Sequence, residues 1–325
     1  MKQEILNILE SRRGEYISGE ELAENFMVSR AAIWKVIASL RKDGHVIKSR
    51  TNKGYMLENF SDVLTEQGII SHLKHDTLIK QVICFNEIDS TNNYAKRLAM
   101  SNQALHGTLI AANYQTSGRG RLGHSFESPA GTGLYMSIVL KSENIESAKF
   151  QFITIVDAVS VCLAIESLCP ELMGETKIKW VNDILIHGKK ITGILTEAIM
   201  SFESGEIDSV VTGIGINVTT KKFAGDYNAG SIFPDGSAKF SRNELCARVA
   251  DYIMDFAEDL TQPFIIQEYR KRSLLINQDI TYMKDNEIFT GHVTGISDDG
   301  GLEIINQSGI KETLRSGEVN TIRRQ

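Results

Sequence analysis

The stretch QTSGRGRLGHSFESPAGTGLYM spans residues 115–136, and its centre, GRGRLG at 118–123, matches the G-x-G-x-x-G pattern of Rossmann nucleotide-binding folds. In those folds a helix begins at the third glycine, and the helix N-terminus receives the pyrophosphate. Here Pro129, Gly131 and Gly133 follow and break any helix, and an apolar strand pattern comes next. The sequence therefore argues against a Rossmann fold and predicts a flexible loop between two strands.

The predicted loop lies between the strand-like runs GTLIAANY at 107–114 and LYMSIVL at 134–140. Arg119 and Arg121 can each bind a carboxylate or a phosphate through two parallel hydrogen bonds. The glycines let the backbone approach a ligand closely, and they leave the loop free to be disordered until the ligand binds. The alternative is a mobile surface loop with two solvated arginines.

Three further segments carry polar groups next to predicted strands. FNEIDSTNNYAKRLA at 85–99 places hydroxyl and amide side chains between a short strand and a helix N-terminus, where a polar ligand can bind. KIKWVNDILIHGKKITGIL at 177–195 predicts two strands joined by a His-Gly turn, with lysine, asparagine and aspartate side chains nearby. SVVTGIGINV at 209–218 predicts a buried strand whose glycines permit close approach.

The composition is that of an ordinary globular protein. The chain has 325 residues, of which 42% are hydrophobic and 23% charged, and this predicts two or three domains with buried cores. No run of about 18 apolar residues and no signal-peptide pattern is present, so we expect a cytoplasmic location. Four scattered cysteines without a C-x-x-C pair predict buried free thiols, and the histidines form no ligand cluster, so no structural metal is expected.

Basic residues are concentrated near the N-terminus. Residues 1–60 hold ten Lys and Arg against eight Asp and Glu, whereas the whole chain carries a net charge of −6. Within residues 29–55, seven basic residues occur with a single acidic one, Asp43. A local excess of this kind on an acidic protein indicates an anionic partner.

The first sixty residues also follow the order of a winged helix-turn-helix. Ser18 begins a capping-box pattern, in which its side chain accepts from the N–H of residue 21 and Glu21 reaches back. A second helix is predicted after Ser29, with apolar residues at helical spacing, and GHVIKSRTNKGYML at 44–57 predicts two short strands around a basic turn. We expect this unit to bind DNA as a two-fold dimer; a small protein-interaction domain is the alternative. The candidate DNA-binding residues are Ser29, Arg30, Trp34, Lys35, Arg50 and Lys53.

Several of these motifs together are specific for one family. GRGRLG, KWVNDILIHGKKITGIL and GIGIN, with DSTN as a weaker fourth, closely resemble the motifs of the bifunctional biotin protein ligases, and the resemblance covers essentially the whole chain. These proteins join an N-terminal repressor domain to a biotin-activating enzyme. The implied fold is a multidomain α/β (α+β) protein. It has a winged helix-turn-helix domain at 1–62, a central mixed-sheet ligase domain at 63–270 and a C-terminal SH3-like β-barrel at 271–325, where alternating strand patterns agree.

The resemblance implies an ATP-dependent biotin–[acetyl-CoA-carboxylase] ligase. With ATP and Mg²⁺ it would form biotinyl-5'-AMP and then transfer biotin to a lysine of a biotin carboxyl carrier domain, that of acetyl-CoA or pyruvate carboxylase. As an adenylate-bound homodimer it would repress biotin genes by binding operator DNA, and no membrane partner is expected. Two alternatives are a lipoate ligase, which shares the catalytic fold, and a repressor that binds biotin without transferring it. GRGRLG favours biotin over lipoate.

The same resemblance assigns roles to individual residues. Lys190 would touch both the biotin carboxylate and the α-phosphate of ATP, and Asp183 would meet the incoming lysine amine. The implied catalytic residues are Lys190, Asp183 and Arg121. The implied biotin-binding residues are Ser90, Thr91, Asn92, Gln115, Gly118, Arg119, Arg121, Lys190 and Gly193. The implied ATP-binding or adenylate-binding residues are Arg119, Arg121, Phe126, Asn182, Lys190 and Asn217.

Three positions depart from the family pattern. Val181 stands where the family usually has proline, which leaves the strand end less fixed. Phe126 replaces a common tryptophan, which keeps an aromatic wall without the indole donor. Gly230 stands where threonine or serine is more frequent, within the segment expected to contact adenine.

Overall fold

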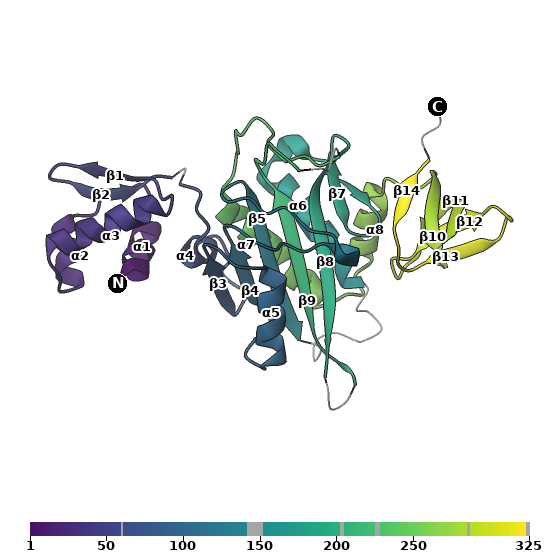
Figure 1. Cartoon of the computed structure of the whole chain (residues 1–325), viewed down its shortest axis with the longest axis horizontal. Coiled ribbons are helices and arrows are strands. Elements are labelled where there is room, and N and C mark those ends of the chain that lie inside the picture. Colours follow the sequence, from purple (N-terminus) through teal and green to yellow (C-terminus); the bar gives the residue numbers. More distant parts are fainter. Residues whose placement is uncertain (60, 142–151, 202–204, 225–227, 285–286, 323–325) are drawn as a thin grey trace.

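The computed structural model describes residues 1–59, 61–141, 152–201, 205–224, 228–284 and 287–322. Figure 1 shows three units in a row: a small helical unit at the N-terminal end, a large sheet with helices on both faces in the middle, and a small all-strand unit at the C-terminal end. This order confirms the coarse multidomain α/β (α+β) architecture predicted from the sequence.

The N-terminal unit has its own hydrophobic core. Its elements are α1 (Lys2–Ser11), α2 (Gly19–Asn25), α3 (Arg30–Lys42), β1 (Ile47–Arg50) and β2 (Gly54–Leu57). The apolar residues of α3 that recur at helical spacing are buried as predicted: Ile33, Val36, Ile37 and Leu40. The antiparallel pair β1–β2 forms the predicted wing, so the helix-turn-helix prediction is confirmed.

The predicted capping box is wrong in one detail. Ser18 does cap α2, but its hydroxyl accepts from the backbone N–H of Glu20 at 3.1 Å, not from residue 21. Glu21 does not reach back, because its carboxylate accepts from Arg12 at 2.6 Å. A charge-assisted bond to a guanidinium is stronger than a bond to a neutral N–H. Glu21 therefore pairs with Arg12 instead of completing the capping box.

The middle unit is built on a seven-stranded mixed sheet in the order β3-β4-β5-β9-β8-β7-β6. Only β3 and β4 run parallel; every other neighbouring pair in this sheet is antiparallel. The sequence predicted two strands within residues 177–195, but the structure has three. The first predicted strand is divided because the chain leaves the sheet between Lys179 and Asp183. The strand bounds are β3 (Gln81–Phe85), β4 (Thr108–Ala112), β5 (Gly133–Lys141), β6 (Lys177–Lys179), β7 (Asp183–Ile186), β8 (Lys189–Met200) and β9 (Ile207–Asn217).

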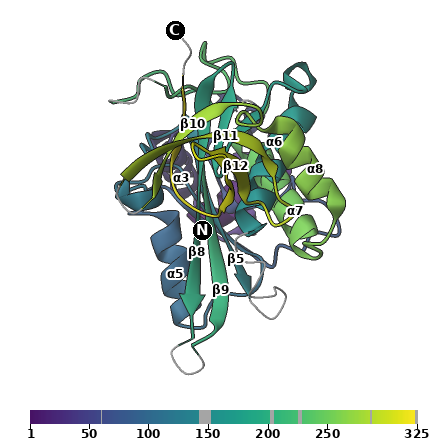
Figure 2. The ribbon, with the colours of Figure 1, turned by 90° about the vertical axis from the view of Figure 1, so that its right-hand side faces the viewer.

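Helices cover the two faces of this sheet unequally, as Figure 2 shows. α5 (Thr91–Met100) packs on β4, β5, β8 and β9 on one face. On the other face α6 (Ile153–Leu168) packs on β8 and β9 and is itself covered by further helices, so it is buried almost all round. The remaining helices among the described residues of this unit are α4 (Glu66–Ile70), α7 (Arg242–Ala257), α8 (Pro263–Arg272) and the 3₁₀ turns η1 (Arg121–Gly123) and η4 (Pro170–Leu172).

The C-terminal unit is a five-stranded antiparallel sheet in the order β13-β12-β11-β10-β14. Among the described residues no strand pairing joins β13 to β14, so closure into a barrel stays a prediction. Ile280, Val293 and Val319 belong to the same hydrophobic cluster as the central sheet, so this unit is continuous with the middle one. The strand bounds are β10 (Asp279–Lys284), β11 (Glu287–Ile296), β12 (Leu302–Asn306), β13 (Lys311–Leu314) and β14 (Val319–Thr321).

Other predictions from composition have mixed outcomes. Within the described part of the chain, no helix has the length and apolar character that crossing a bilayer requires. All four cysteines are free, but only Cys162, Cys169 and Cys246 are buried; Cys84 is half-buried.

Candidate functional site

The glycine-rich stretch forms a loop that connects β4 to β5 along the edge of a cleft. Its one regular element is η1, in which Leu122 has a left-handed φ of +53°. No α-helix begins at Gly123 in this fully described stretch, because η1 ends there and extended backbone follows at His124. The Rossmann interpretation is therefore excluded on geometry, as the sequence predicted.

The loop, the start of α5 and the strands β7–β9 enclose three adjoining pockets. One pocket, of about 240 Å³, is lined by both loop arginines, Lys190 and Asp183, and by Glu318 of the C-terminal unit. A narrower pocket of about 20 Å³ runs beneath the loop toward α5. A third, of about 520 Å³, extends past Asn217. Phe126 lines all three, so they form one cleft divided by its ring.

Hydroxyl and amide groups form a connected chain in the narrow pocket. Gln115 Oε1 accepts from the Thr91 backbone N–H at 2.8 Å, and Gln115 Nε2 donates to Ser128 Oγ at 2.8 Å. Ser137 on β5 donates to the Thr91 hydroxyl at 2.8 Å. Ser90 caps α5, accepting from the Asn93 N–H at 3.5 Å. The chain fixes these polar atoms in place, which suits a ligand head group rich in donors and acceptors.

Two glycines of β9 make room for side chains in the cleft. A Cβ at Gly213 would lie 1.9 Å from Asn92 Oδ1, and one at Gly215 would lie 2.4 Å from the Phe126 ring. Phe126 also lies against Gly193 of β8, where a Cβ would be 3.3 Å from the ring. The glycines of GIGIN and ITGIL are thus required by close packing inside the cleft.

The cationic side chains of the cleft each have a protein partner. Lys190 Nζ lies 2.9 Å from Asp183 Oδ1, with both side chains partly exposed. Arg121 donates to Asn182 Oδ1 at 3.0 Å, and Arg119 donates to Asn93 Oδ1 at 3.1 Å. Lys190, Arg119 and Arg121 therefore converge on one cleft, which favours binding of an anionic ligand.

Every predicted ligand-site residue lies at this cleft. Gly118 does not line a pocket directly but packs on Phe126, Ser128 and Gln115 at the base of the loop. At Gly230, a Cβ would lie 2.6 Å from the Lys189 Cβ, which accounts for glycine at that departure.

The other two positions that depart from the family pattern, Val181 and Phe126, also make defined contacts. The peptide bond between Trp180 and Val181 is cis, and the Val181 carbonyl accepts from the Tyr269 hydroxyl at 3.0 Å. Phe126 keeps the aromatic wall that was predicted for it.

Sequence reasoning missed several polar residues of the cleft. Glu197 on β8 accepts from Lys96 at 2.8 Å and from Asn92 at 3.2 Å, and it lies 3.7 Å from Arg119. Strand alternation could have found it, since it is two positions beyond Leu195 and four beyond Gly193, on the same face. Glu318 gave no such signal, because it comes from the separate C-terminal unit.

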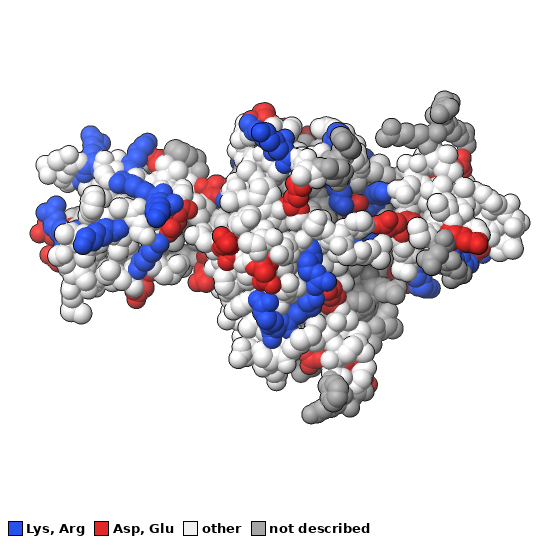
Figure 3. Space-filling view, in the orientation of Figure 1, with Lys and Arg blue, Asp and Glu red and all other residues white. Residues whose placement is uncertain are grey.

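The predicted DNA-binding side chains are all exposed on the N-terminal unit. Figure 3 shows Lys and Arg gathered over this unit. Ser29 caps α3, accepting from the Ala32 N–H at 3.2 Å. Two other basic residues of the region are engaged within the unit: Arg41 donates to the Ile47 carbonyl at 2.6 Å, and Lys48 pairs with Glu58.

The fold of the N-terminal unit and the cleft of the middle unit together define a class of protein. It is a helix-turn-helix unit joined to a ligase unit of the biotin/lipoate type. Residues 84–217 match the "Biotin/lipoate A/B protein ligase family", and residues 2–56 match the family described as "HTH domain". The chain belongs to the family of bifunctional ligase/repressor BirA proteins, and it is an enzyme of the biotin protein ligase class.

The relatives that support this membership span nearly the whole chain. The sequence is 33% identical to the bifunctional ligase/repressor BirA of Bacillus subtilis over 96% of both chains, and 30% identical to that of Escherichia coli over 94% of this chain and 93% of the other. Among solved structures, the biotin protein ligase of Aquifex aeolicus in complex with biotin and ATP superposes with a TM-score of 0.61 at 28% identity. It covers 75% of this chain and 100% of that one.

Proposed function

We propose that the chain forms biotinyl-5'-AMP from biotin and ATP and transfers the biotin to a lysine of a biotin carboxyl carrier domain of acetyl-CoA or pyruvate carboxylase. The observation that carries this proposal is the convergence of Lys190, Asp183 and Arg121 beside the hydroxyl–amide chain of Thr91 and Gln115. That arrangement supports a polar head group at one end of the cleft and an activated carboxylate at the other.

In the first step a biotin carboxylate oxygen attacks the α-phosphorus of ATP, and the bond to pyrophosphate breaks. Both reactants are anionic, so cations must lie where negative charge accumulates. Lys190, Arg119 and Arg121 supply them, and Asn182 holds Arg121 in position at 3.0 Å. Mg²⁺ would enter together with ATP and would neutralise part of the phosphate charge.

The cleft also provides for the nucleotide. The pocket that contains Asn217, Phe126 and Lys190 has about 520 Å³ of space, enough for a nucleoside. Ser90, Thr91, Asn92, Gln115, Gly118 and Gly193 would surround the biotin end.

In the second step the carrier lysine amine attacks the acyl carbon of the mixed anhydride, and AMP leaves with the electron pair. A lysine amine has an ordinary pKa of about 10.4, so it must lose a proton to react. Asp183 is the carboxylate placed to accept that proton. When Lys190 turns from Asp183 to the ligand, their 2.9 Å pair opens and the carboxylate becomes available for this role.

We further propose that the adenylate-bound protein forms a homodimer whose helix-turn-helix units bind operator DNA. The exposed Arg30, Trp34 and Lys35 of α3 would enter the major groove, while Arg50 and Lys53 of the wing would contact phosphates. We assign DNA binding to residues 1–62 and ligation to residues 63–270. We also propose that the strands of residues 271–325 close into an SH3-like barrel.

The test is biotin transfer to a purified carrier domain with ATP and Mg²⁺, comparing the wild type with Lys190→Ala and offering lipoate as a competitor. We expect ligation by the wild type and a loss of at least about 10²-fold in the variant, since Lys190 stabilises charge in the transition state. Preferred transfer of lipoate would contradict the proposal. Biotin binding without transfer by the wild type would identify a ligand-sensing repressor instead.

A further inference from the structure

The buried guanidinium of Arg242 contacts both ends of the glycine-rich loop between β4 and β5, which we call the ligand loop. Arg242, the first residue of α7, is 2% exposed. Its Nη1 donates to the Gly133 carbonyl at 3.0 Å, and its Nη2 donates to Asn113 Oδ1 at 3.3 Å. Asn113 directly follows β4 and Gly133 begins β5, so the residues between them are the loop that carries Arg119 and Arg121. The antiparallel pairing of β4 with β5 brings the two ends of the loop together, and the Arg242 side chain adds a direct link to each end.

The same side chain holds the segment that leads out of the N-terminal unit. The Arg242 backbone N–H donates to Asp62 Oδ1 at 2.7 Å, and its Nε donates to Asp62 Oδ2 at 3.0 Å. Asn113 adds a direct link, because its amide makes two 3.0 Å bonds with the backbone of Leu64. We call Asp62, Leu64, Asn113, Gly133 and Arg242 the loop-base cluster.

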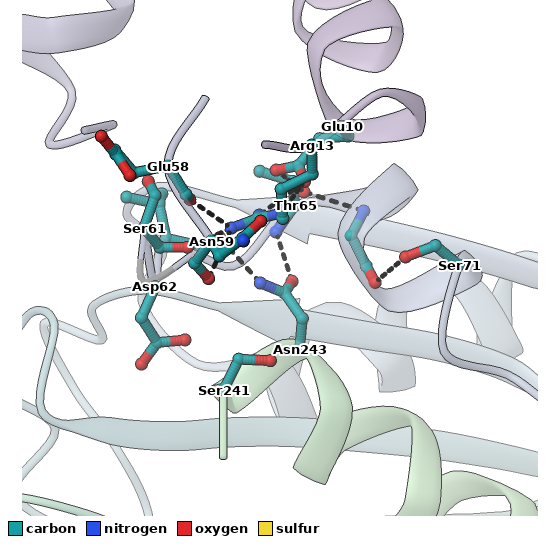
Figure 4. Close-up of polar contacts among 12 residues, drawn as sticks. Glu10, Arg13, Glu58, Asn59, Ser61, Asp62, Thr65, Ser71, Ser241 and Asn243 are labelled. Atoms are coloured by element: carbon teal, nitrogen blue, oxygen red, sulfur yellow. Dashed lines mark hydrogen bonds and ion pairs between the residues drawn. The ribbon is translucent and has the colours of Figure 1, made fainter. Parts of the chain in front are cut away.

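Polar contacts continue from this cluster to the N-terminal unit, as Figure 4 shows. Asn243 donates to the Val63 carbonyl at 3.0 Å and accepts from the Thr65 backbone N–H at 3.0 Å. The Thr65 hydroxyl donates to Glu10 Oε1 of α1 at 3.2 Å. The base of the ligand loop is thus connected to the first helix of the helix-turn-helix unit through side chains with little exposure.

We propose that Arg242 is a positioning residue for the ligand loop, which ties both loop ends to the segment 62–65 and so reduces the cost of ordering the loop around the ligand. The proposal rests on the proposed ligase function for the identity of the ligand. Restraints at the ends of a flexible segment that go beyond the β4–β5 pairing lower the entropy that the segment loses when it becomes ordered around a ligand. Arg242 uses all three nitrogens of its planar fork, and a lysine cannot make these contacts at once.

The experiment is limited trypsin digestion of the full-length, ligand-free protein, with mass spectrometry to follow cleavage after Arg119 and Arg121. Arg242→Lys is compared with the wild type and with Arg272→Lys. Arg272 is a matched control because it is also a buried arginine, 5% exposed and paired with Glu166 and Glu268, but it lies in α8 away from the loop. We expect loop cleavage about tenfold faster in Arg242→Lys, and within about twofold of the wild type in Arg272→Lys, since cleavage follows the population of open loop.

Equal loop cleavage in the two lysine variants would overturn the proposal. If Arg242→Lys does not fold, Asn113→Ser removes the acceptor at the start of the loop and should give a smaller increase, of about threefold, because Arg242 keeps its bond to the Gly133 carbonyl. Steady-state ligation adds a second readout. A positioning role raises the KM for biotin about tenfold and changes kcat little, whereas general loss of structure lowers the active fraction and leaves KM unchanged. If the wild type neither binds nor transfers biotin, the proposed function fails, but digestion of the ligand-free protein still decides the role of Arg242.

Discussion

At the scale of single residues, Asp157 is a carboxyl group whose pKa is raised by burial. It lies in α6 on the face of the sheet opposite the cleft, and it accepts hydrogen bonds from Thr196 and Thr212 of β8 and β9. Burial raises the pKa of this carboxyl to about 7, and the two hydroxyl donors only partly oppose the shift. The unfolded chain loses this proton near pH 4 while the folded protein keeps it, so the group makes folding less favourable as pH rises from about 4 to about 7.

Asp157→Asn removes this titration but keeps an acceptor for the threonines. We expect the unfolding midpoint of the variant to rise relative to the wild type between pH 5 and pH 8, by the equivalent of roughly 2–3 kcal/mol. Thermal or urea unfolding at both pH values measures the change. Asp298→Asn, at a carboxylate that is 95% exposed, is the control and should show no such trend. A difference between Asp157→Asn and the wild type that is the same at both pH values would show that Asp157 does not titrate in this range.

At the scale of elements, the wing formed by β1, β2 and the turn between them presents two exposed basic side chains to solvent: Arg50, the last residue of β1, and Lys53 in the turn. Replacing both with alanine should lower the slope of log affinity against log salt concentration by about 2, because each phosphate contact releases roughly 0.9 of a counterion. Binding to a random-sequence DNA duplex, measured by fluorescence anisotropy at several salt concentrations, tests this without knowledge of the operator. The control replaces Lys80 and Lys311, which are exposed outside the N-terminal unit. An unchanged slope in the wing variant would place the phosphate contacts elsewhere.

The elements also show why some features could be predicted from sequence and others could not. Helix-turn-helix, wing and cleft motifs depend on residues close in sequence, such as Ser90 at the start of α5, so local patterns were sufficient. The loop-base cluster depends on Arg242 and Asp62, which are 180 positions apart, and no local pattern signals that pairing. The capping box failed for a related reason: Glu21 had a competing partner, Arg12, nine positions away.

At the scale of the whole molecule, the two small units attach to the middle one in different ways. The C-terminal strands share one hydrophobic cluster with the central sheet, whereas the N-terminal unit has a separate cluster. Leu6 and Leu40 of the N-terminal unit face Val63, Leu64 and Phe85 across a cavity of about 360 Å³, so apolar packing between these units is incomplete. Polar contacts must therefore supply much of the attachment of the N-terminal unit.

Arg13 holds the chain where it leads out of the N-terminal unit. It pairs with the buried Glu10 and donates to the carbonyls of Glu58 at 3.0 Å and Ser61 at 2.8 Å. Arg13→Ala should release Glu58 and Ser61 while the separate N-terminal core stays folded. We expect a larger radius of gyration by small-angle scattering, faster proteolysis near residues 58–65, and unchanged helix content by circular dichroism.

The neighbouring Arg12 provides the control for this prediction. It pairs with Glu15 and Glu21 inside the N-terminal unit, so Arg12→Ala removes a guanidinium and two ion pairs without touching the attachment. These pairs are exposed and contribute little to stability. If both variants keep the wild-type radius of gyration, the cavity-lining apolar residues hold the units together and the polar attachment is secondary. If only Arg13→Ala expands, the position of the N-terminal unit depends on contacts directly next to the segment 62–65, which Arg242 ties to the ligand loop.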